Sequence, residues 1–225
     1  MLHRIIFALG LCSSGLASPV YSRDNYPALS TSKGFNLIVN LTNPSDDFDP
    51  PIHKSFVTTI HVGAGLSLVG TSADKGPVFF QNGTDEERTA GQSTVVTLGG
   101  TPPTAAGFKL TPGDQPAGFA SGDLDFGLGT PGIAIHGEPV AYLTPETFYA
   151  CNEPLEYYQG KDFVVIKQRA AGSDVPAECR AVRLIPKCAE LAPLPADAYA
   201  NYDFAFESSC YDDVAAIDWS QYSQG

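Results

Sequence analysis

The feature that most constrains the fold of this chain is an alternation of apolar and polar side chains with a period of two. In the segment FNLIVNLTN, residues 35–43, one face would carry Phe35, Leu37, Val39 and Leu41, and the other Asn36, Ile38, Asn40 and Thr42. Successive side chains of a β-strand point to opposite faces, so this pattern predicts a strand with one buried face. The segment SFVTTIHV, residues 55–62, repeats the pattern.

Short segments of the same kind recur along most of the chain. They are PVFFQNGT (77–84), TVVTL (94–98), AGFKL (106–110), DLDFGL (123–128), GIAIH (132–136), TFYAC (147–151), DFVVIKQ (162–168) and CRAVRLI (179–185). Roughly ten strands, with a turn every 8 to 12 residues, are typical of antiparallel sandwiches and barrels. The sequence therefore predicts an all-β fold, an antiparallel β-sandwich or barrel with little helix, and leaves the choice between the two open.

Helices have little support in the sequence. Only DDVAAIDW, residues 212–219, has a helical pattern, and that pattern is short. Strands do not alternate with helical segments, which argues against a doubly wound fold.

The first residues have the pattern of a secretory signal peptide. His3 and Arg4 precede an apolar run, residues 5–11, and small residues then end at Ala17. The alternative is a membrane anchor, but a bilayer span needs about 20 apolar residues. We therefore expect cleavage after Ala17, a mature chain that begins at Ser18, and an extracellular, secreted protein.

Composition divides the rest of the chain into three parts. Residues 18–33 are polar and lack a sustained period, so we expect a flexible leader. Residues 34–192 hold the strand candidates and form the predicted β-domain. Residues 193–225 are acidic and rich in Tyr and Ala, which favours a C-terminal extension that a disulfide at Cys210 attaches to the domain.

Four cysteines remain after the signal peptide: Cys151, Cys179, Cys188 and Cys210. An even number in an oxidising compartment predicts two disulfides. Zinc binding is the alternative, but no C-x-x-C pair occurs. If the strands at 147–151, 162–168 and 179–185 form a meander, Cys151 lies near Cys188 and leaves Cys179 for Cys210. Four cysteines allow three pairings, so the others stay open.

Two N-x-S/T motifs agree with export. Asn40-Leu41-Thr42 and Asn82-Gly83-Thr84 both lack a central proline, so we expect glycans on Asn40 and Asn82. The strand alternation places Asn40 on the outward face, where a glycan would fit.

The charge and the glycine pattern exclude several classes of ligand. A formal net charge of −12 repels nucleic acid and anionic membranes, so we expect neither as a partner. The stretch HVGAGLSLVG, residues 61–70, superficially suggests a dinucleotide-binding loop, but Leu68 stands where the third glycine is required and no helix follows. The same stretch fails as a serine-hydrolase elbow, because a strand would leave Ser67 as an ordinary side chain. We expect a turn between strands and no cofactor.

The histidines give no clear catalytic or metal-binding pattern. His53, His61 and His136 lie on separate segments without ligand spacing, so surface positions are the favoured interpretation over a metal site. A copper oxygenase with an N-terminal histidine is disfavoured because the mature chain would begin at Ser18.

Carboxylates offer a second, weak pattern. Asp123 and Asp125 share one strand face, and Asp46, Asp47 and Asp49 crowd one loop. Neither group fits a calcium loop, and turn or surface roles are favoured for both. We therefore predict no catalytic and no metal residues.

Several segments together resemble a known family. They are GFNLIVNLTNPSDDFDPPIH, IHVGAGLSLVG, VFFQNGT, GGTPP, GLGTPGIAIHG, FYACNEP and ECRAVRLIPKCAEL. They resemble a family of small secreted proteins of filamentous ascomycete fungi whose domain has no assigned function, over about residues 33–192. The resemblance implies a fungal source and an all-β fold, and it brings no catalytic residues.

These observations favour a secreted, disulfide-bonded, N-glycosylated protein with a non-catalytic role outside the cell. Its expected partner is cell-wall polysaccharide, matrix or a host surface. The alternative is a secreted carbohydrate-active hydrolase that uses paired carboxylates such as Asp123, Asp125, Glu138 or Glu146. A third possibility, a small-molecule carrier, would need a hollow barrel.

Overall fold

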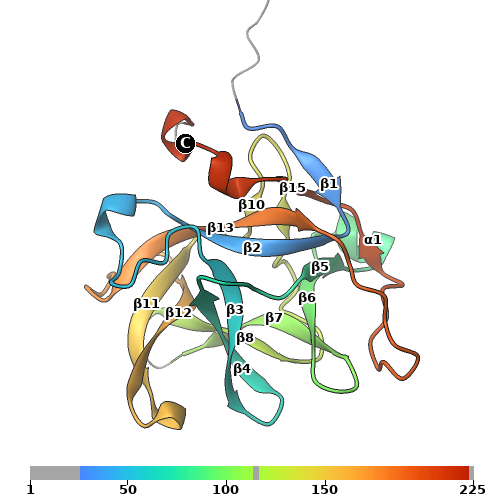
Figure 1. Cartoon of the computed structure of the whole chain (residues 1–225), viewed down its shortest axis with the longest axis horizontal. Helices are drawn as coiled ribbons and strands as arrows, with labels where there is room; N and C mark the ends of the chain where they lie inside the picture. The colour runs from blue at the N-terminus through green and yellow to red at the C-terminus, as the bar shows by residue number, and fades with distance from the viewer. Residues whose placement is uncertain (1–25, 114–116, 223–225) are drawn as a thin grey trace, which may run out of the picture.

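The structure is a computed structural model that describes residues 26–113 and 117–222 (Figure 1). Its strands are β1 (Ser30–Ser32), β2 (Gly34–Leu41), β3 (Phe56–Gly63), β4 (Leu66–Ser72), β5 (Phe79–Asn82), β6 (Thr94–Gly99), β7 (Thr104–Pro112), β8 (Phe119–Phe126), β9 (Ile135–His136), β10 (Tyr142–Leu143), β11 (Phe148–Leu155), β12 (Lys161–Arg169), β13 (Cys179–Ala189), β14 (Ala205–Phe206) and β15 (Ser208–Cys210). The helical elements are α1 (Asp85–Thr89) and the 3-10 turns η1 (Pro44–Asp46), η2 (Glu156–Tyr158), η3 (Val214–Ala216) and η4 (Trp219–Gln221). The predicted all-β fold with little helix is confirmed. The predicted signal peptide lies outside the described residues.

Eleven of the strands form one large antiparallel sheet, which closes on itself. Their order is β11-β13-β2-β3-β4-β12-β8-β7-β6-β5-β14. Further ladders join β2 to β5 and β11 to β12, so the hydrogen bonding returns to strands already in the sheet. Such closure is how a barrel removes unpaired edges.

The main core lies inside this sheet and draws side chains from almost every large strand. The fully or nearly fully buried members include Phe35, Leu37, Val39, Val57, Val69, Phe79, Val95, Phe108, Leu124, Phe148, Ile166, Val182 and Leu184. On β2 and β13 these residues are two positions apart, as the alternation predicts.

The outer face of β2 and β13 is covered as well. We call residues 205–222, which include β14, β15, η3 and η4, the C-terminal segment. Its Tyr211 and Val214 pack with Ile38 of β2 and Ile185 of β13 in a second apolar cluster. Figure 1 shows β15 and the residues after it above β2 and β13, on the side away from β3 and β8. The prediction that β2 has only one buried face is therefore wrong, because a distant segment supplies the second cover.

The C-terminal segment is built differently from the predicted short helix. Residues 212–219 form the 3-10 turn η3 and the start of η4 instead of one helix. The strand before them, β15, pairs with β1 in the register Ser30↔Cys210. The end of the predicted flexible leader 18–33 is thus a strand; residues 18–25 of that leader lie outside the described residues.

Two disulfides are present, but the preferred pairing was wrong. Cys151 is bonded to Cys179, and Cys188 is bonded to Cys210. The three strands do not form a meander, because β11 lies between β12 and β13 and places Cys151 directly opposite Cys179. The disulfide between Cys188 and Cys210 joins the C-terminal segment to β13.

The stretch HVGAGLSLVG is a hairpin between β3 and β4, as predicted. Gly65 has a φ of +71°, which favours glycine, and the pairing shifts register between His61 and Gly63. Ser67 is a strand residue whose backbone N–H donates to the Asp125 carboxylate at 3.0 Å.

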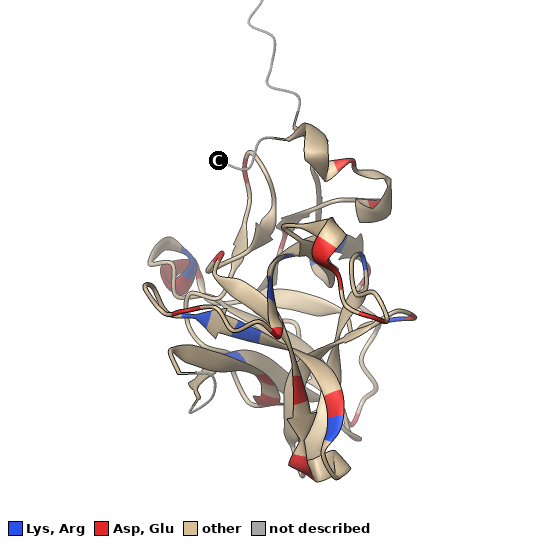
Figure 2. Ribbon diagram, turned by 90° about the vertical axis from the view of Figure 1, so that its left-hand side faces the viewer, with Lys and Arg blue, Asp and Glu red and all other residues tan. Residues whose placement is uncertain are grey.

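In the ribbon of Figure 2, positions occupied by Lys and Arg are interspersed with positions occupied by Asp and Glu. Over residues 26–113 and 117–222, none of the helices has the length and apolar character needed to span a bilayer.

Candidate functional site

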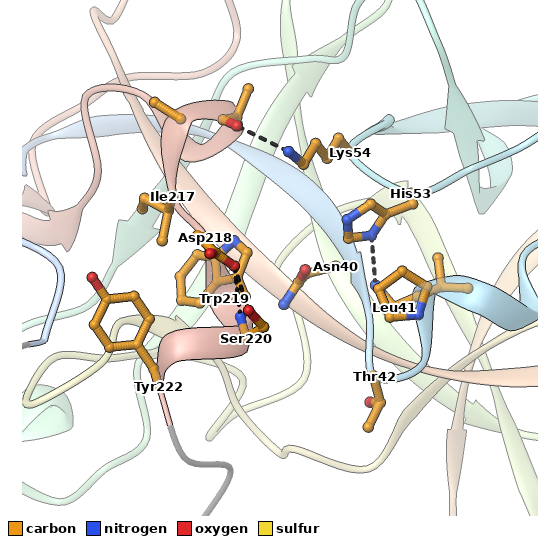
Figure 3. A pocket seen from close by; sticks show the side chains of 13 residues that line it. Asn40, Leu41, Thr42, His53, Lys54, Ile217, Asp218, Trp219, Ser220 and Tyr222 are labelled. Carbon is orange, nitrogen blue, oxygen red and sulfur yellow. Dashed lines mark hydrogen bonds between the residues drawn. The ribbon is translucent and has the colours of Figure 1, made fainter.

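One concave feature is a pocket of about 550 Å³ between the end of β2 and the C-terminal segment. We call it the Asn40 pocket. The side chains that could act on a molecule inside it are Asn40, His53, Lys54, Asp218, Trp219 and Tyr222 (Figure 3). A volume of roughly 300 to 1,000 Å³ is usual for pockets that bind small molecules.

One wall of this pocket is the loop between β2 and β3, which Asp47 organises. Its carboxylate accepts hydrogen bonds from the backbone N–H groups of Phe48, Ile52 and His53, at 2.7 to 3.0 Å. Asp46 pairs with Arg180 at 2.9 Å. The carboxylates of Asp46 and Asp47 are therefore engaged within the protein, and Asp47 organises the turn.

The opposite wall is the end of the C-terminal segment. Asp218 caps η4: its carboxylate accepts from the hydroxyl and the backbone N–H of Ser220 and from the amide of Gln221, and these bonds hold the pKa of Asp218 below its usual value. The Trp219 ring meets the Tyr211 ring edge-on, with centroids 5.6 Å apart. The buried Tyr211 thereby fixes the position of the indole.

A lysine joins the two walls. The Lys54 ammonium donates to the backbone carbonyl of Ala215 at 2.9 Å. Lys54 has a φ of +68°, and its backbone N–H donates to Val39 at 2.8 Å, which holds the loop against β2.

Asn40 has an unusual environment within the pocket. The residue as a whole is only 4% exposed, yet it lines the pocket. Figure 3 shows this side chain directed into the space between Trp219 and Leu41. The expectation of an open, outward position for Asn40 is wrong, because the C-terminal segment covers that face of β2.

His53 is held as a neutral imidazole. Its Nδ1 accepts a hydrogen bond of 3.2 Å from the backbone N–H of Leu41. Burial lowers the pKa of His53, the Lys54 charge lowers it further, and Asp47 opposes both effects. A proton on Nδ1 would break the bond to Leu41, so the histidine serves as part of the wall.

This arrangement suits binding better than catalysis. The Ser220 hydroxyl donates to Asp218 at 2.6 Å and is therefore not paired with the histidine as a nucleophile would be. The pocket instead combines the rings of Trp219 and Tyr222 with amide, imidazole and carboxylate groups. Such a lining can hold a polar molecule that has an apolar face, for example a sugar.

A second concave surface lies on another part of the barrel. We call it the aromatic groove; it measures about 400 Å³ and is bordered by Leu128, Tyr199 and Phe204. These three side chains are 63%, 78% and 54% exposed. Asn82, Gln92 and Asn201 supply amides, and Glu87 is the only charged residue in the lining.

The four carboxylates proposed for a hydrolase have other partners or positions. Asp123 is 9% exposed on β8 and accepts from the Ser121 hydroxyl at 2.9 Å; burial raises the pKa of Asp123. Its neighbour Asp125 receives the N–H of Ser67. Glu146 forms an ion pair with Arg183, and Glu138 lies in the connection between β9 and β10.

The other two histidines lie apart from the Asn40 pocket. His61 meets Tyr157 edge-on near the β3–β4 hairpin, and His136 packs against Tyr142 on β9. Within the described ranges, no group of three or more His, Cys, Asp or Glu residues is placed to hold a metal ion.

Sequence reasoning did not identify Trp219 and Tyr222 as pocket residues. They fall in the extension at 193–225, which its composition marked as peripheral. The signal available was that Trp219 is the single tryptophan of the chain, since exposing an indole in a tail would be costly.

The comparisons with known proteins agree with the family expected from the sequence. The chain is 50% identical to the antigenic protein SchS34 of Stachybotrys chartarum, over 92% of this chain and 99% of that protein. No solved structure matches. The family model described as domain of unknown function DUF7907 matches residues 32–188. The chain therefore belongs to the DUF7907 family.

Proposed function

We propose that this protein is exported and acts outside the cell, without catalysis, by binding a neutral polysaccharide of the fungal wall, the surrounding matrix or a host surface. Two disulfides support export, because such bonds persist in oxidising compartments. The N-terminal pattern of residues 1–17 supports it independently. The relative from Stachybotrys chartarum is named an antigenic protein, which agrees with a protein met outside the fungal cell.

The observation that carries the binding proposal is the aromatic groove. Tyr199 and Phe204 are 78% and 54% exposed, and exposed apolar groups that gather on one surface commonly mark a binding site. A pyranose ring has an apolar face that packs on an aromatic ring, while its hydroxyls bond to amides. The groove offers both kinds of group side by side.

The charge of the groove favours a neutral ligand over an anionic one. Its lining holds the carboxylate of Glu87 and neither Lys nor Arg. The whole chain carries a formal charge of −12, which further repels polyanions. Neutral glucans and chitin therefore fit this surface better than acidic polymers or nucleic acid.

The hydrolase alternative receives no support from a specific observation. Asp123 and Asp125 are bonded to Ser121 and to the backbone of Ser67. Glu146 is paired with Arg183. Because these partners already hold the carboxylates, we do not propose a glycosidase.

A pull-down assay tests the proposal. The purified protein is incubated with insoluble chitin, β-glucan and fungal walls, and the bound fraction is measured. The Tyr199→Ala and Phe204→Ala variants should each bind roughly tenfold more weakly, since truncating an aromatic anchor commonly costs more than 1 kcal/mol. Tyr157→Ala is the matched control, because Tyr157 is 55% exposed but lies near the β3–β4 hairpin.

Because Asn82 also lines the groove, the assay includes Asn82→Gln, which removes any glycan there and keeps the aromatic rings. Retention of the wild type on none of the polymers, or equal retention of the Tyr199 and Tyr157 variants, would refute binding through this groove.

A further inference from the structure

We propose that Asn40 is N-glycosylated and that the Asn40 pocket holds the first sugar of this glycan against Trp219. The stem of the glycan is then enclosed between β2 and the C-terminal segment. This inference rests on the proposed export, since N-glycans are added to chains that enter the secretory route. The pocket is thus occupied by the protein's own modification.

The first argument is the state of the Asn40 amide. Asn40 begins the motif Asn40-Leu41-Thr42, yet the residue is 4% exposed. A buried acceptor normally has no room for a glycan. Here the amide is directed into a space of about 550 Å³. This space gives an attached sugar the room that the burial of the residue would otherwise deny.

The second argument is the lining of that space. Trp219 and Tyr222 contribute rings, with centroids 6.3 Å apart, and the edge-on contact with Tyr211 holds the indole in place. An N-acetylglucosamine has one apolar ring face for the indole, and hydroxyl and acetamido groups for polar neighbours. Asp218 and His53 lie on opposite walls and supply such neighbours.

The order of synthesis allows the modification although the folded site is closed. Asn40 is made and exported long before residues 205–222 exist, so the acceptor is accessible in the growing chain. In the transfer, Nδ2 of Asn40 forms a bond to C1 of the sugar and loses one proton. The bond between C1 and the diphosphate of a lipid-linked oligosaccharide donor breaks, and its electron pair leaves with the diphosphate. The C-terminal segment then folds over the attached sugar.

Site-resolved enzymatic release tests the proposal on the secreted full-length protein. Peptide N-glycosidase hydrolyses the bond between asparagine and glycan and leaves aspartate, which mass spectrometry in ¹⁸O-water detects at each site. On native protein we expect release at Asn40 to be roughly tenfold or more slower than on denatured protein, because the enzyme needs the segment to open. Asn82, which is only half-buried, serves as the internal reference.

Two pairs of variants distinguish a sugar held in the Asn40 pocket from a general loss of structure. Trp219→Ala should accelerate native release at Asn40 towards the denatured rate, whereas the matched aromatic variant Tyr157→Ala should not. Thr42→Ala abolishes the motif and Thr42→Ser keeps it. We expect Thr42→Ala to lower the thermal midpoint and Thr42→Ser to preserve both the glycan and the midpoint.

The outcomes distinguish this proposal from the proposed function. If the secreted protein has an unmodified Asn40, the proposed glycan in the Asn40 pocket is wrong and export is unaffected. The same holds if the glycan at Asn40 is released from native protein as fast as from denatured protein. If the chain stays inside the cell and carries no glycan, both the proposed export and the proposed glycan at Asn40 are wrong.

Discussion

The phenol oxygen of Tyr211 accepts a hydrogen bond of 2.9 Å from the backbone N–H of Ala141. Both residues are fully buried, and they belong to segments separated by 70 positions. Tyr211 also exchanges backbone hydrogen bonds with Pro186 and Cys188 of β13. Through its side chain and its backbone, this single residue therefore ties the C-terminal segment to the connection before β10 and to β13.

Removing the hydroxyl of Tyr211 should destabilise the protein. In Tyr211→Phe the buried N–H of Ala141 loses its acceptor, which costs about 1 to 3 kcal/mol. Tyr211→Ala also leaves a cavity and should cost about 3 to 5 kcal/mol. Urea unfolding measures both values. An equal stability of Tyr211→Phe and the wild type would show that Ala141 finds another partner.

The disulfide between Cys188 and Cys210 should control the docking of the C-terminal segment. Replacing both cysteines by serine is expected to cost about 2 to 4 kcal/mol and to increase hydrogen exchange in residues 205–222. The matched control is the pair Cys151 and Cys179, which joins the neighbouring strands β11 and β13. Its removal should lower global stability without selective exchange in the C-terminal segment. Selective hydrogen exchange in residues 205–222 of both variants would contradict these separate roles of the two disulfides.

Acidification should destabilise the loop that carries His53. Burial lowers the pKa of His53 below 6.5, so the unfolded state takes up this proton at a higher pH than the folded state. The contribution of neutral His53 to the free energy of unfolding is complete above pH 6.5. It decreases as the pH falls from 6.5 to the lowered pKa of His53 in the folded state. His53→Asn keeps an acceptor for Leu41 and should reduce this pH dependence. Urea unfolding over a pH series measures it, and a ring pKa at or above 6.5 by NMR would contradict the prediction.

Asp123 should have the opposite pH dependence. Burial raises the pKa of Asp123 above 3.8, so the folded state binds this proton more tightly than the unfolded state. The contribution of protonated Asp123 to the free energy of unfolding is present at low pH. It is lost as the pH rises through the raised pKa of Asp123 in the folded state. Asp123→Asn should therefore increase stability at neutral pH, by up to about 1 kcal/mol. Asp125→Asn, which weakens the bond from Ser67, should give no such gain. A loss of stability in Asp123→Asn would show that its charge is needed.

The local pattern of the sequence predicted much of the fold. The alternation in residues 35–41 identified β2 and its inward face because the period of a strand depends only on neighbouring residues. The failed glycine motif at residues 61–70 likewise identified a hairpin, since the turn needs Gly65 and no distant partner. Both results follow from short-range stereochemistry.

The sequence could not predict contacts between distant segments. It favoured Cys151 with Cys188 because a meander was assumed, whereas β11 pairs with both β12 and β13. The composition of residues 193–225 indicated a peripheral extension, although Tyr211 and Val214 are buried there.

By itself, then, the sequence determined that this chain forms antiparallel strands held by two disulfides, because alternation and cysteine number are local properties. Only the tertiary structure decided which strands are neighbours, which cysteines meet, and that Trp219 covers Asn40. Those outcomes depend on how burial of apolar surface is shared between β2, β13 and a segment far along the chain, which no local pattern encodes.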